Sequence, residues 1–140
     1  MLRLGVCLIG IVIIGLSVAV GPAWAGDDPS IQGQEREGIQ AAMGAFIDAQ
    51  KGKDGSILHY DPVVGKLTKL RLVELHEGIV KKGHFFVSCA DFVDEKERPY
   101  DLDFLVVPTD GGFRVNQAII HAEDGEKRKY QVEQRWPGLF

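Results

Sequence analysis

The sequence predicts an α+β fold in which one N-terminal amphipathic helix packs on a curved, four-stranded antiparallel meander. Two observations predict it. Apolar side chains recur at helical spacing within residues 34–51, and residues 67–121 then read as four extended segments in series, each followed by a turn signal. The turns recur about every dozen residues, which is typical of strands joined one after another in hairpins.

The helix is predicted from a stripe of apolar side chains. The spacing follows the helical period, so these side chains lie on one face and are expected to pack on the sheet. Asp28-Pro29 or Ser30 is expected to cap the helix, and Gly52 to end it. The stripe comprises Ile39, Ala42, Met43, Phe46 and Ile47.

The four strands are expected at about residues 70–80, 84–93, 100–107 and 113–122. Lys82-Gly83 is the expected first turn, a charged run ending at Pro99 the second, and Asp110-Gly111 a two-residue hairpin turn. A short extended piece at residues 57–60 comes before them. No internal repeat is present.

The first residues predict an export signal. Arg3 precedes an apolar run over residues 4–20, and Gly21-Pro22 then breaks the helix. Ala23-Trp24-Ala25 follows the small-x-small pattern of a signal-peptidase site, so cleavage is expected after Ala25. The alternative is an uncleaved membrane anchor. The protein is expected to be periplasmic or secreted, and to touch the membrane only through this segment before cleavage.

The domain organisation follows from these boundaries. Residues 1–25 are the expected signal peptide, 26–33 a flexible leader, 34–122 a single α+β domain and 123–140 a C-terminal tail. Tyr130 and Val132, and Trp136 beyond them, could add a short edge strand to that tail. Cys89 is the only cysteine after residue 25, which excludes an internal disulfide in the exported chain and favours burial within a strand. The net charge of −4 argues against nucleic acid as a partner.

Opposed residues on paired strands share a face, so the turns predict the two faces of the sheet. The Asp110-Gly111 turn sets four pairs on the apolar face: Val106 with Val115, Phe104 with Gln117, Leu102 with Ile119, and Tyr100 with His121. Two registers compete at the longer middle turn. The favoured one puts Ser88, Ala90 and Phe92 on the apolar face, because the shifted one would bury Asp91 there.

The element order over about residues 34–122 resembles the cystatin-like architecture, which nuclear-transport-factor-like folds share. The nearest local motif is Pro62-Val63-Val64-Gly65, similar to the Gln-x-Val-x-Gly hairpin of cystatin inhibitors. The glutamine is absent here, so the resemblance implies the fold and not inhibition of cysteine proteases.

Three polar residues on the predicted apolar face are candidates for a ligand pocket. Tyr100, Gln117 and His121 would lie at the open end of a cone between helix and sheet, where His121 could act as a general base. The alternative is that they lie at the sheet end and hydrogen-bond to backbone or water.

The opposite face collects the candidate metal ligands Glu74, His76, Asp91, Asp101 and Asp103. The alternative is a solvated acidic face. His76 and Cys89 are also opposed in this register, as a base and a nucleophile would be. The same face carries apolar residues that need a cover, either the C-terminal tail or a second copy of the chain in a homodimer: Leu72, Phe85, Val87, Val93, Leu105, Val107 and Ile120.

No phosphate loop, nucleophile motif or established metal-ligand spacing is present, so we expect no catalytic residue and no cofactor. The sequence therefore favours an exported, small non-enzymatic binding or interaction module whose partner is an unknown protein or small molecule. The alternative is a small enzyme or ligand carrier that uses Tyr100, Gln117 and His121 in the cone. A core filled by Met43, Phe46 and Phe104 would favour the module.

Overall fold

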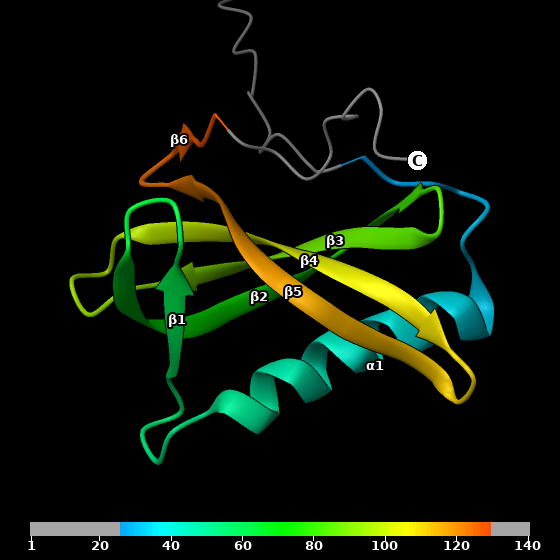
Figure 1. The fold of residues 1–140 in the computed structure, drawn as a ribbon, viewed down its shortest axis with the longest axis horizontal. Coiled ribbons are helices and arrows are strands. Elements are labelled where there is room, and N and C mark those ends of the chain that lie inside the picture. Colours follow the sequence, from blue (N-terminus) through cyan, green and yellow to red (C-terminus); the bar gives the residue numbers. More distant parts are fainter. Residues whose placement is uncertain (1–25, 130–140) are drawn as a thin grey trace, which may run out of the picture.

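The computed structural model describes residues 26–129 of the 140-residue chain. One helix crosses one face of a curved antiparallel sheet (Figure 1). The strands follow one another in chain order across the sheet. The elements are α1 (Gly33–Gln50), β1 (Ile57–Asp61), β2 (Lys66–Lys82), β3 (Phe85–Val93), β4 (Pro99–Thr109), β5 (Gly112–Glu123) and β6 (Glu126–Lys127).

The predicted four-stranded meander is wrong, because the sheet has six strands within the described residues. The α+β content and the antiparallel pairing are confirmed. The segment read as a short extended piece is β1, which pairs with the first part of β2. The Asp61 carboxylate accepts a hydrogen bond from the Val63 N–H at 2.9 Å, which stabilises the turn between them.

The sixth strand follows a turn that the sequence analysis did not use. Asp124 and Gly125 both have positive φ, at 53° and 79°. Two such residues in a row match the hairpin turn that Asp-Gly favours, so the chain reverses and β6 pairs with β5. The edge strand predicted around Tyr130 and Val132 lies outside the described residues.

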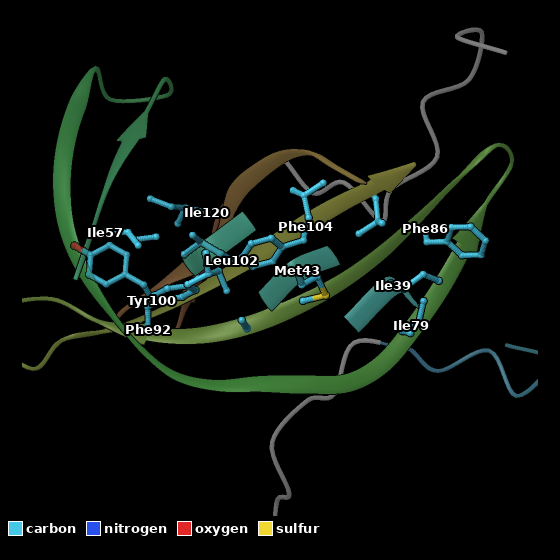
Figure 2. Close-up of a cluster of buried hydrophobic side chains, with 14 of the residues drawn as sticks. Ile39, Met43, Ile57, Ile79, Phe86, Phe92, Tyr100, Leu102, Phe104 and Ile120 are labelled. Atoms are coloured by element: carbon cyan, nitrogen blue, oxygen red, sulfur yellow. The ribbon is translucent and has the colours of Figure 1, made fainter. Parts of the chain in front are cut away.

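The helical stripe is confirmed, since Ile39, Met43 and Ile47 are the buried residues of α1. They pack with Phe104 and other apolar side chains in the space between the helix and the sheet, and the labelled side chains of Figure 2 converge there. The Phe46 and Phe104 rings meet edge to face with centroids 6.0 Å apart. Met43 and Phe104 are fully buried, so apolar side chains fill this region.

The favoured register between β3 and β4 is confirmed. Ser88 pairs with Phe104, Ala90 with Leu102, and Phe92 with Tyr100. These residues face the core, so the alternating ones face away from α1. We call that side of the sheet the outer face.

The predicted β4–β5 register holds only next to the turn. Val106 pairs with Val115 as expected, but a bulge follows, and Phe104 then pairs with Ala118. At a second bulge, Asp101 pairs with Ala122 and Leu102 pairs with Ile120. His121 is the extra residue of β5 between these two pairs. Because each slip of one residue exchanges the faces, Ile120 joins the core instead of the outer face and Gln117 is exposed.

The β2–β3 ladder is also irregular. Leu75 pairs with Ala90 and Ile79 with Ser88, so β2 has two more residues than β3 between these pairs. The predicted first turn is wrong by one residue, because Lys82 pairs with Phe85. The Ser88 hydroxyl donates to the Gly78 carbonyl at 2.8 Å, inside the irregular stretch. His76 also lies in this stretch, and the irregular pairing determines which way its side chain points.

Within residues 26–129, no helix combines the length and the apolar character needed to cross a bilayer.

Candidate functional site: a polar cluster on the outer face

Six polar side chains gather on the outer face, from four neighbouring strands. Two of the strand pairs bring them together directly, because Cys89 pairs with Asp103 and Asp91 pairs with Asp101. The irregular part of β2 and the second β5 bulge add one histidine each. We call this set the outer-face cluster: His76, Cys89, Asp91, Asp101, Asp103 and His121.

His76 links two members of the cluster through its two ring nitrogens. Its Nδ1 lies 3.0 Å from the Cys89 Sγ, and its Nε2 lies 3.0 Å from the Asp91 Oδ2. An aspartate that accepts from Nε2–H leaves Nδ1 with its lone pair directed at the sulfur. Cys89 itself is 1% exposed. The arrangement favours either transfer of the thiol proton to the His76 Nδ1 or a ligand that the Nδ1 and the Cys89 Sγ bind together.

His121 forms the second pair of the cluster. Its Nδ1 lies 3.0 Å from the Asp103 Oδ2, and both side chains are buried. Among the described residues, the other carboxylate oxygen of Asp103 and the Oδ1 of Asp101 are buried and have no hydrogen-bond partner. Such atoms normally cost stability unless something pairs with them.

Electrostatics also single out Asp101. Burial, together with the nearby carboxylates of Asp103 and Asp91, raises the pKa of its carboxyl to about 6, although His121 and His76 oppose the shift. Its charge is therefore disfavoured at neutral pH relative to an exposed aspartate. A cation at this position would reverse that preference.

Three members of the cluster could hold one metal ion. His76, Cys89 and Asp101 each offer a ligand atom, and those atoms lie within 4.8 Å of one another. Of the other predicted ligands, Asp91 contacts His76, Asp103 contacts His121, and Glu74 is exposed beside Asp91. His76 and Asp101 were predicted as metal ligands, whereas Cys89 was predicted to be buried within a strand, with a nucleophile as the other reading.

The predicted pocket residues do not meet. The Tyr100 hydroxyl donates to the Glu123 Oε1 at 2.8 Å, Gln117 is exposed, and His121 lies in the outer-face cluster. Burial and the hydrogen bond to Glu123 together raise the pKa of Tyr100 to about 12. The two bulges account for this result, and nothing in the local sequence of β5 marks where they fall.

No family model, curated protein or solved structure matches this chain. The resemblance to cystatin-like proteins therefore stays a prediction.

Proposed function

We propose that this protein is an exported, non-enzymatic binding module whose ligand occupies the outer-face cluster. The observation that carries the proposal is the buried carboxylate of Asp103, which is 1% exposed and keeps one oxygen without a partner among the described residues. An unsatisfied buried polar group costs about 1–3 kcal/mol. Costs of this kind gather at sites where a ligand supplies the missing interaction.

The filled core supports the module over the cone-pocket alternative. Met43, Leu102 and Phe104 are completely buried between α1 and the sheet. A ligand pocket needs a concave space lined by a few convergent polar groups. The polar groups predicted for that pocket do not converge there, since His121 contacts Asp103 and Gln117 is exposed.

Native mass spectrometry of protein recovered from the exported fraction tests this function. We expect a non-covalent adduct on the wild-type protein that is lost in Asp103→Asn. Asp110→Asn, in the exposed β4–β5 turn, is the matched control and should keep the adduct. A bare wild-type mass, or turnover of any substrate that depends on the cluster, would reject the proposal.

Export is part of the proposal and has its own test. The apolar run over residues 4–20 and the Ala23-Trp24-Ala25 site support it. The intact mass of periplasmic or secreted material should correspond to a chain that begins at Gly26. A mass that retains Met1 would contradict cleavage.

A thiol-dependent enzyme is the second candidate, because the Asp91–His76–Cys89 line has the order of an orienting acid, a base and a nucleophile. Its thiolate should react with iodoacetamide far faster than a free cysteine at pH 6, and His76→Gln should abolish the excess rate. The burial of Cys89 argues against it, because a substrate has to reach the sulfur.

A second copy of the chain is our proposed protein partner, and the exposed apolar side chains favour a contact different from the outer face. β1 is an edge strand among the described strands, and its hairpin with β2 carries an apolar surface. Edge strands of this kind pair readily with another copy. The surface consists of six side chains more than half exposed: Leu58, Tyr60, Val63, Val64, Leu67 and Val73.

Light scattering during size-exclusion chromatography tests this contact. The wild-type protein should show a dimer at high concentration, and Leu58→Lys should give a monomer. Leu105→Lys, on the half-buried outer face, should leave the dimer intact. The reverse result would restore the outer face as the contact.

A further inference from the structure

We propose that the ligand of the outer-face cluster is a divalent transition-metal ion of zinc type, bound by Cys89 Sγ, His76 Nδ1 and a carboxylate oxygen of Asp101. The inference rests on the proposed function, in which this cluster is the ligand site. It adds the identity of the ligand and assigns roles to four side chains of the cluster: His76, Cys89, Asp91 and Asp101.

The donor set decides the class of metal. One sulfur, one imidazole nitrogen and one carboxylate oxygen suit zinc and cobalt, which accept all three donor types. Calcium and magnesium are disfavoured, because they require six or more oxygen ligands and rarely use sulfur or nitrogen. The sequence suggested a hard cation such as calcium for this acidic face. The donor atoms of the cluster are better suited to a borderline-soft cation such as zinc.

The spacing fits a single ion. The three ligand atoms lie within 4.8 Å of one another, and the His76 Nδ1 and Cys89 Sγ are 3.0 Å apart. Tetrahedral zinc, with bonds of about 2.0–2.3 Å, holds its donors roughly 3.3–3.8 Å apart. Small side-chain rotations on rigid strands would bring the donors to these separations.

Asp91 supplies the outer contact that zinc-bound histidines usually have. Its Oδ2 lies 3.0 Å from the Nε2 of His76, the ring nitrogen that points away from Cys89. A carboxylate there fixes the tautomer that presents Nδ1 to the metal and raises the basicity of the ring. Asp91 is therefore a positioning residue in this proposal, not a ligand.

The partner-free oxygens are an independent pointer to a cation. Asp103 lies opposite Cys89 and is 99% buried, and its Oδ1 has no partner among the described residues. The Oδ1 of Asp101 is also buried without a hydrogen-bond partner. Three neighbouring carboxylates on a half-buried face repel one another, and a divalent ion relieves that repulsion. The three donors found among the described residues leave a fourth position on the ion for a further ligand, such as water.

Cobalt titration of untagged protein, first freed of metal with a chelator, tests the proposal. Thiolate bound to Co²⁺ gives a charge-transfer band in the near ultraviolet, and Cys89 is the only cysteine from Gly26 onwards. We expect the band to saturate at one equivalent and to disappear when zinc is added. Wild-type binding without the band would overturn the proposal, and this readout requires no variant to fold.

Variants then separate the roles of the side chains. Cys89→Ser should abolish the band, Asp101→Asn should weaken zinc binding at least tenfold, and Asp91→Asn should weaken it by about 10–100-fold through the histidine. Asp110→Asn is the control and should bind as the wild type does. Equal affinity in Asp101→Asn and the control would exclude Asp101 as a ligand and overturn the proposed site.

The metal and the function can fail separately. If the wild-type protein binds neither cobalt nor zinc but still carries an adduct that depends on Asp103, the metal assignment is wrong and the binding module stands. If the adduct is also absent, both are wrong.

Discussion

The Nδ1 of His121 lies 3.0 Å from the Oδ2 of Asp103, and the two side chains are 8% and 1% exposed. Both residues face away from the helix, although the hairpin turn alone would have put His121 on the core side opposite Tyr100. The pair exists because β5 bulges at His121.

Removing His121 should destabilise the protein. His121→Ala takes away the Nδ1 contact and leaves the Asp103 carboxylate buried with less compensation, which typically costs about 3–5 kcal/mol. Urea denaturation of metal-free protein should show a lower midpoint with an unchanged slope. Replacing both residues, as Asp103→Leu with His121→Leu, should cost less than the sum of the single changes. Additive losses would show that the two side chains do not interact.

Asp101→Asn should stabilise the metal-free protein at pH 7. Burial raises the pKa of Asp101 to about 6 in the folded state, above the unfolded value of 3.8. For an acid with a raised pKa, the folded state is penalised as the pH rises through this interval, so the penalty is complete at pH 7 and absent below about pH 3.8. The gain should be on the order of 2 kcal/mol at pH 7 and close to zero at pH 3.5. Thermal melts in chelator measure it, and an equal gain at both pH values would contradict this origin.

Mild acid should weaken the fold through His59. This side chain is buried on β1, and burial lowers its pKa, with Asp61 partly opposing the shift. A histidine with a lowered pKa contributes stability above its unfolded pKa of about 6.5, and that stability is lost as the pH falls below it. His59→Gln should flatten the decline between pH 6.5 and pH 5 in urea denaturation, whereas His84→Gln, in the exposed β2–β3 turn, should not. The same decline in both variants would assign the effect to other groups.

The filled core predicts a large cavity effect at Met43. Met43→Ala removes a fully buried side chain that packs with Phe104, so the free energy of unfolding should fall by about 2–5 kcal/mol. The next residue provides the control, since a methyl group at Gly44 would meet nothing within 4 Å. Gly44→Ala should stabilise the helix by about 0.5–1 kcal/mol. A loss below 1 kcal/mol in Met43→Ala would indicate a loosely packed core and would reopen the cone pocket.

Features that repeat along the chain could be predicted from the order of its residues. Ile39, Met43 and Ile47 recur at the helical period, so the buried face of α1 followed from spacing alone. The β3–β4 register also followed from the sequence, because the alternative would have buried Asp91 among apolar side chains.

The positions at which the strands break their alternation could not be predicted in this way. A bulge of one residue exchanges the two faces of everything beyond it, and its position depends on cross-strand packing rather than on the local sequence. The bulge at His121 moved that residue from Tyr100 to Asp103, and the irregular stretch of β2 brought His76 to Cys89. The same holds for β1 and β6, the outermost of the described strands, because a short strand is stable only when a neighbouring strand pairs with its backbone.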